Sequence, residues 1–252
     1  MNTHIAVGIL KYTKWGEVKA SFTRMINSMR SPIHIVVYGE SGVGKTQFLN
    51  TIMSNGIISD ARTRDINRKR FRLPNGRNII FCDTPGHKSL KNVRDTLKPY
   101  FHKKKIQGII NIVDYGYSSV PDMDSTSVFN VDTREVKDKY LEDNRLRQLE
   151  QLSEWQDLVN SQNGVKWFLT LVNKADIWYE KKEAVMNYYL CGEYAQALNG
   201  MERCCKVVAF PFCSIISPFC GKPMMLIMSE KDKIAMHQDL FVEIQKLSFE
   251  KE

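Results

Sequence analysis

Short apolar runs recur along the chain and are bounded by polar residues. They lie at residues 34–38, 106–113, 167–172 and 207–213. Runs of this length without strict alternation are typical of strands that are buried on both faces of a parallel sheet. Residues 67–73 and 78–83 are predicted to form two further strands that flank a turn at 74–76.

Helical patterns fill much of the chain between these runs. Helices are predicted from about Thr46 onward and over residues 88–104, 178–198 and 231–248. Strands that alternate with helices favour a parallel sheet covered on both faces. The sequence therefore predicts an α/β domain with a mostly parallel central sheet and helices on both sides.

The segment before the first strand is predicted to be an amphipathic helix over residues 12–30, with Trp15, Phe22 and Met29 on its apolar face. Such a helix can pack on the domain, or it can bind a membrane surface or a partner. We expect residues 1–32 to form an N-terminal extension and residues 33–252 to form the main domain.

Residues 115–164 are long for a single connection between two strands, and we expect an insertion there. Residues 118–133 have loop character, whereas residues 134–159 are highly charged and are predicted to form a long exposed helix. The helix is expected to be peripheral to the fold. Its large apolar residues are expected to be partly exposed for a partner: Leu149, Leu152, Trp155 and Leu158.

Composition and charge narrow the class of protein. The 252 residues are 43% hydrophobic and 25% charged, an ordinary globular composition, and the six cysteines include no CxxC pair. No apolar run reaches the roughly 20 residues that a membrane-spanning helix needs, so we expect a cytoplasmic protein with reduced thiols. The net charge is +8. The basic residues gather at 62–72 and 103–105, which could be solvated faces or could meet RNA, an anionic membrane surface or an acidic partner.

The most specific motif follows the first strand. Gly39-Glu40-Ser41-Gly42-Val43-Gly44-Lys45-Thr46 matches GxxxxGK[ST] between an apolar strand and a helix. Backbone N–H groups of such a loop surround the β-phosphate of a nucleotide, Lys45 bridges the β- and γ-phosphates, and Thr46 ligates Mg²⁺. Residues Glu40 to Gln47 are therefore the predicted phosphate-binding set.

A second motif, Asn173-Lys174-Ala175-Asp176, follows the strand 167–172 and distinguishes GTP from ATP. The Asp176 carboxylate can accept hydrogen bonds from guanine N1–H and the 2-amino group, and the Lys174 stem can cover the base. Adenine lacks that pair of donors, so it would leave the carboxylate unpaired. We expect GTP and GDP as the ligands.

A third motif, Asp83-Thr84-Pro85-Gly86, closes the strand 78–83. Its carboxylate can hold a Mg²⁺-bound water, and the N–H of Gly86 can meet the γ-phosphate. His87 follows directly, and its imidazole can orient the water that attacks the γ-phosphate, although it could also be an inert exposed histidine.

In this order the three motifs resemble the translation-factor-related class of P-loop GTPases, which holds Ras-like, Era-like and elongation-factor GTPases, over roughly residues 33–248. The resemblance implies that Thr63, in a stretch similar to Era-like switch I, ligates Mg²⁺ when the γ-phosphate is present. It also implies that Ser214 and Ile215 contact guanine O6 through the backbone, although an alanine is usual at position 215. The stretches 97–101 and 107–114 are similar to ADP-ribosylation-factor-like GTPases and the SRP receptor β-subunit, which act at membranes.

Two functions follow as expectations. The first is a GTPase, slow without a partner, that hydrolyses GTP and acts as a switch for a protein effector, in the cytoplasm or peripherally at a membrane. The second is a GTP-binding structural or docking subunit with little or no hydrolysis. Thr63 and His87 favour the first, and the lack of an assignable arginine finger leaves room for the second.

Overall fold

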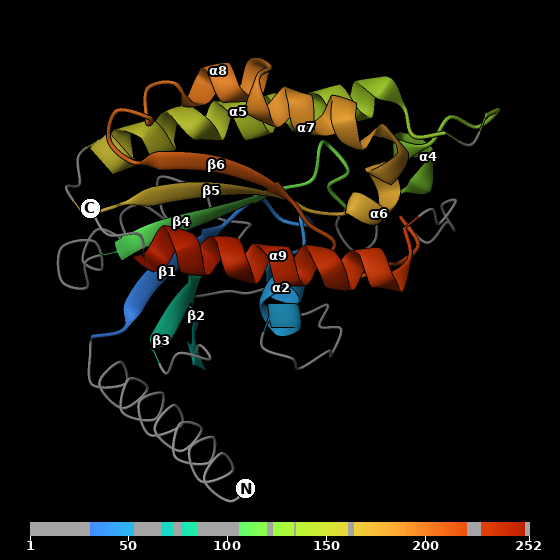
Figure 1. Cartoon of the computed structure of the whole chain (residues 1–252). Coiled ribbons are helices and arrows are strands. Elements are labelled where there is room, and N and C mark those ends of the chain that lie inside the picture. Colours follow the sequence, from blue (N-terminus) through green and yellow to red (C-terminus); the bar gives the residue numbers. More distant parts are fainter. Residues whose placement is uncertain are drawn as a thin grey trace, which may run out of the picture.

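A sheet runs through the centre of the molecule (Figure 1), and the computed structural model describes residues 31–52, 67–72, 77–84, 106–119, 123–133, 135–160, 164–220 and 228–249. Within these residues the sheet has six strands in the order β2-β3-β1-β4-β5-β6. The strands are β1 Ile33–Tyr38, β2 Asn67–Arg72, β3 Asn78–Asp83, β4 Ile106–Val113, β5 Trp167–Val172 and β6 Lys206–Pro211.

All neighbouring strands of this sheet pair in parallel except β2, which pairs antiparallel with β3 at the edge. The predicted mostly parallel α/β sheet is therefore confirmed. The last strand ends at Pro211, two residues before the end of the predicted run.

Helices cover both faces of the sheet (Figure 1). On one face, α2 Lys45–Ile52 and α9 Glu230–Phe249 bury Phe48, Leu240 and Ile244 against the strands. On the other face lie α5 Asp138–Asn160, α7 Lys182–Leu190 and α8 Glu193–Leu198. The sheet therefore separates two apolar cores, as expected for strands that are buried on both sides.

Helix α5 is part of this core, and the expectation that its apolar residues are partly exposed is wrong for three of the four, whereas Leu149 is half-buried. Leu152, Trp155 and Leu158 are 1%, 0% and 3% exposed. The Trp155 ring packs edge-on against Tyr38 of β1 and Phe168 of β5, with centroids 5.0 and 6.2 Å apart. A spacing of three residues places these apolar side chains in one stripe along the helix. The many charges of the segment belong to the rest of the helix circumference, so α5 is the helix that connects β4 to β5 across the sheet.

The predicted helix 178–198 is divided. The chain forms α6 Ala175–Trp178, the 3-10 turn Tyr179–Lys181, α7 and α8. The break falls at Cys191 and Gly192, where a Cβ on Gly192 would lie 2.9 Å from Tyr188 Cα.

A short helix, α4 Ser125–Val128, lies inside the predicted loop, and its cap Asp124 accepts a hydrogen bond from Thr126 N. The predicted helices 12–30 and 88–104 and the turn 74–76 lie outside the described residues.

Candidate nucleotide-binding site

The phosphate loop connects β1 to α2, and its backbone is held at positions that only glycine tolerates. Gly42 and Gly44 have φ of 85° and 95°, a region that side chains rarely adopt. A Cβ on Gly42 would lie 2.1 Å from Ser119 O, and one on Gly44 would lie 2.4 Å from Asn173 Nδ2. The loop therefore packs directly against the segment after β4 and against the predicted guanine motif.

Lys45 is buried at the start of α2, with 7% of its surface exposed. Its ammonium donates hydrogen bonds of 2.7 Å to the carbonyls of Gly39 and Glu40. Burial lowers the pKa of Lys45 to about 8, and this effect is opposed by the nearby carboxylates of Asp83, Glu40 and Asp114. A buried ammonium aimed into the loop that precedes it is suited to bind phosphate.

Glu40 ties the phosphate loop to α5. Its carboxylate accepts a 2.7 Å hydrogen bond from Gln151 and lies 3.9 Å from Arg147 Nε. Burial raises the pKa of Glu40, while Arg147 acts in the opposite direction. Among the other predicted loop residues, Ser41, Thr46 and Gln47 are half-buried and Val43 is fully buried.

Asn173 joins the guanine motif to the rest of the site. Its Nδ2 donates to Val43 O of the phosphate loop at 2.8 Å. Its Oδ1 accepts from both N and Oγ of Ser214 at 3.0 Å. The sequence-predicted phosphate loop, guanine motif and Ser214 loop thus meet through one amide side chain, and half-buried Ile215 follows Ser214 in that loop.

Asp176 is buried within the same loop cluster, at 3% exposure. Its carboxylate accepts from Cys213 Sγ at 3.5 Å and from Ser217 N at 3.3 Å. Burial raises the pKa of Asp176, and the hydrogen bond from Ser217 N opposes that shift most strongly. The side chain predicted to read guanine is therefore in a low-dielectric environment, which strengthens hydrogen bonds to a carboxylate.

Asp83 lies at the carboxyl end of β3, next to the phosphate loop. It is 1% exposed, and of the nearby carboxylates it has the largest influence on the Lys45 pKa. Thr84 fastens this strand end to β1 by donating from N and Oγ1 to Val37 O, at 3.2 and 2.9 Å. Mg²⁺ prefers a few hard oxygen ligands together with phosphates and waters. The Thr46 hydroxyl and the Asp83 carboxylate fit that preference, whereas Thr63, Gly86 and His87 lie outside the described residues.

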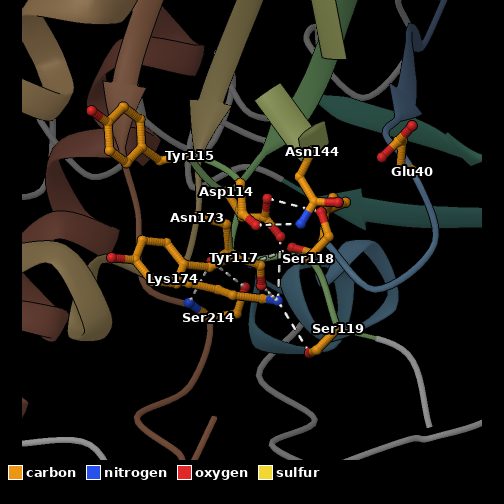
Figure 2. Close-up of polar contacts among 12 residues, drawn as sticks. Glu40, Asp114, Tyr115, Tyr117, Ser118, Ser119, Asn144, Asn173, Lys174 and Ser214 are labelled. Atoms are coloured by element: carbon orange, nitrogen blue, oxygen red, sulfur yellow. Dashed lines mark hydrogen bonds and ion pairs between the residues drawn. The ribbon is translucent and has the colours of Figure 1, made fainter. Parts of the chain in front are cut away.

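The segment that follows β4 forms another wall of the site (Figure 2), which was not predicted from the sequence. Lys174 Nζ lies 3.3 Å from Asp114 Oδ2 and 3.3 Å from Ser119 Oγ, and it also donates to Tyr117 O. Asp114 is fully buried. The signal in the sequence was a carboxylate directly after the buried strand 106–113, but nothing in the sequence identified Lys174 as its partner.

Comparisons with known proteins agree with this geometry. Residues 34–160 match the family model described as "50S ribosome-binding GTPase". Translation initiation factor IF-2 of Orientia tsutsugamushi (strain Boryong) is 38% identical over 68 residues, which are 26% of this chain and 8% of that protein. The chain thus spans a small part of this relative's length.

Several solved structures match this chain at low identity and with TM-scores below 0.5. The mammalian SRP receptor structure has a TM-score of 0.49 at 13% identity, over 85% of this chain and 99% of that one. The Arl6 BBS3 small GTPase of Trypanosoma brucei, bound to GppNp, has a TM-score of 0.46 at 16% identity, over 87% and 99%. The Roco2 RocCORdC structure of Methanosarcina barkeri, bound to GDP, has a TM-score of 0.45 at 14% identity, over 86% of this chain and 50% of that one. Among the described residues, no helix is both long and apolar enough to span a membrane.

Proposed function

Because the chain belongs to the 50S ribosome-binding GTPase family, we propose that it binds GTP together with Mg²⁺, hydrolyses it to GDP and phosphate, and controls a partner by the difference between the two states. The observation that carries the proposal is the Asn173 amide, which holds the phosphate loop and the guanine motif as one site. A site that combines these two elements recognises a guanine nucleotide by both of its ends.

Each predicted site residue has a separate role in binding the nucleotide. Lys45 stabilises the β- and γ-phosphate charge, and the loop N–H groups surround the β-phosphate. Thr46 would ligate Mg²⁺ through its hydroxyl, Asp83 would hold the ion through a water, and Thr63 would be a further ligand. Mg²⁺, when bound, neutralises charge on the phosphates. Asp176 accepts hydrogen bonds from guanine, and the Lys174 stem covers the base.

Hydrolysis is tested at His87, which orients the attacking water. Since that contact is made mainly in the transition state, His87→Ala lowers kcat and leaves GTP affinity nearly unchanged. A positioned group of this kind contributes about 10²–10⁴ in rate, and His87→Gln retains more activity than His87→Ala. The measurement is single-turnover hydrolysis of bound GTP, with and without cell extract, because a partner-supplied arginine can add about 10³–10⁵. Equal rates for wild type and His87→Ala in both conditions would favour the alternative, a GTP-binding docking subunit.

The partner is expected to meet the basic edge of the sheet. Arg68, Arg70 and Arg72 alternate along β2 and are all exposed, whereas Lys69 points to the other face and donates to Asn50 of α2 at 2.8 Å. Residues two apart in a strand are about 6.7 Å apart, so the three arginines leave the edge strand in a row on one face of the sheet. Their neighbours across the ladder are Cys82, Ile80 and Asn78, which carry no charge. A row of arginines suits a polyanion, and the family description points to the RNA of a ribosomal subunit rather than to a membrane surface.

The edge surface is tested by RNA binding at several salt concentrations. Changing Arg68, Arg70 and Arg72 to Gln is expected to weaken binding and to reduce the salt slope by about one for each phosphate that is no longer neutralised. The control changes three scattered exposed basic residues, Lys139, Arg203 and Lys231, to Gln. If the edge variant instead loses binding to anionic vesicles and keeps its RNA affinity, the partner is a membrane surface.

A further inference from the structure

An ion pair lies just beyond the carboxyl ends of β4 and β5, between a buried Asp114 and the half-buried Lys174 of the guanine motif. Asp114, directly after β4, is 0% exposed. Its Oδ2 lies 3.3 Å from Lys174 Nζ, and its Oδ1 accepts hydrogen bonds of 3.0 Å from Ser118 Oγ and Gln148 Nε2. A carboxylate buried to this degree is very unfavourable unless it is paired and hydrogen-bonded. The buried Asp114 carboxylate is therefore stabilised by the positive charge of Lys174.

The carboxylate itself is held in place from α5 and α7. Gln148 of α5 donates through its NH₂ to Asp114. The other end of that amide accepts from the Tyr189 hydroxyl of α7 at 3.3 Å, and Tyr189 OH in turn accepts from Tyr115 N at 3.0 Å. Each hydrogen bond in this chain determines whether the next group donates or accepts. The network therefore fixes which way the Asp114 carboxylate faces.

Lys174 also depends on this arrangement. Its backbone adopts a left-handed conformation, φ 59° and ψ 36°, which is uncommon for a residue with a side chain and persists only where the surroundings hold it. The polar groups around its ammonium, on Asp114, Tyr117 and Ser119, all come from the segment after β4 (Figure 2). The direction of the aliphatic stem is therefore set by where that segment holds the charged end.

We infer that Asp114 is a positioning residue for the guanine base: it anchors the Lys174 ammonium so that the lysine stem stands as one wall of the base pocket before a nucleotide arrives. The inference rests on the proposed guanine binding. Without the anchor the stem would have to be ordered at each binding event, and this ordering cost would lower affinity. The phosphate loop should keep its structure, because its hydrogen bonds with Lys45 and Asn173 do not involve Asp114. Asp114 acts on Lys45 through its charge alone, and less strongly than Asp83 and Glu40 do.

The test is the isosteric variant Asp114→Asn, compared with Asp157→Asn on the exposed side of α5. Loss of a hydrogen bond to a charged group lowers an equilibrium constant by about 10- to 100-fold. We expect GTP and GDP affinity to fall equally by this factor, with faster release of a fluorescent GDP analogue. Binding of Mg²⁺ with inorganic triphosphate, which has no base, should fall much less at pH 7, where Lys45 is mostly charged. A general loss of structure would weaken the binding of both ligands.

Two further variants separate positioning from folding. Lys174→Met combined with Asp114→Asn should bind GDP no more weakly than Lys174→Met alone, since Asp114 acts through Lys174. Gln148→Leu, which leaves the ion pair in place, should also speed GDP release, by a smaller factor than Asp114→Asn does. The inference would be overturned if Asp114→Asn released GDP at the wild-type rate. It would also be overturned if the affinity losses of the two single variants added up in the double variant. A wild-type protein that binds inorganic triphosphate but does not prefer guanine nucleotides would instead refute the proposed function.

Discussion

The buried ammonium of Lys45 is expected to make nucleotide affinity depend on pH in a range where lysines normally do not titrate. Its pKa is about 8 in the protein, compared with about 10.4 for an exposed lysine. The phosphates of a bound nucleotide favour the charged form and raise this pKa. We therefore expect nucleotide binding to be coupled to proton uptake at and above pH 8.

The size of the effect follows from the protonated fraction of the free protein. With a pKa of about 8, roughly nine-tenths of Lys45 is charged at pH 7 and roughly one-tenth at pH 9, so GDP affinity is expected to fall about tenfold over that interval, or about 1.4 kcal/mol. Isothermal titration calorimetry with Mg²⁺-GDP in buffers of different ionisation enthalpy should give an uptake of about 0.9 proton at pH 9 by the same arithmetic. Lys45→Met is the control, because it binds more weakly without this uptake, and any titration of the nucleotide is common to both proteins.

Unfolding cannot mimic this result, because stability changes in the opposite direction. The pKa of Lys45 is lower in the folded than in the unfolded chain, so the fold is least favoured where the buried ammonium is charged. The stability linked to Lys45 is present above the unfolded pKa and is lost as pH falls toward 8. Nucleotide-free protein should therefore gain stability from Lys45 between pH 8 and about 10.4 while its GDP affinity falls. An affinity that is flat between pH 7 and 9, with no proton uptake, would refute the assignment of Lys45 to the phosphates.

Three other changes test separate parts of the site and the fold. Asp176→Asn should weaken GTP and favour xanthosine triphosphate in competition binding, and a wild-type protein that binds ATP as well as GTP would contradict the guanine assignment. Thr46→Ala should remove much of the Mg²⁺ dependence of GTP affinity by calorimetry with and without Mg²⁺; unchanged dependence would exclude Thr46 as a ligand. Trp155→Ala should cost about 3–5 kcal/mol in urea unfolding, whereas Leu146→Ala, at a side chain 49% exposed, should change stability by about 0.5 kcal/mol or less; a near-neutral Trp155→Ala would place α5 outside the core.

The strands and the phosphate loop could be predicted from the sequence because their signals are local. An apolar run such as 167–172 fills one strand, and the GxxxxGK[ST] spacing needs only eight consecutive residues. Helix α5 was misread because its charge was averaged over the whole circumference. The stripe through Leu152, Trp155 and Leu158 is narrow, so a small apolar fraction was enough to bury one side of a long helix.

The ion pair between Asp114 and Lys174 could not be predicted in the same way. The two residues are sixty positions apart, and they meet because β4 and β5 are adjacent in the sheet, with Val113 paired to Val172. Carboxyl ends of adjacent parallel strands lie at the same edge, which is where ligand sites form in open α/β sheets. Knowledge of the strand order, rather than of either residue, was the missing information.

The hydrogen bonds of the site show that it is organised for binding at low cost. Lys45 has three donors and gives two of them to the carbonyls of Gly39 and Glu40. Asp176 has two lone pairs on each oxygen and accepts one hydrogen bond on each within the described residues. Both side chains therefore keep capacity for phosphate and guanine without breaking the contacts that hold them. Asn173 differs, because its Oδ1 already accepts two hydrogen bonds from Ser214. Its oxygen has no lone pair left for the base. In the proposed guanine site Asn173 would therefore hold the loops together rather than read the base through that atom.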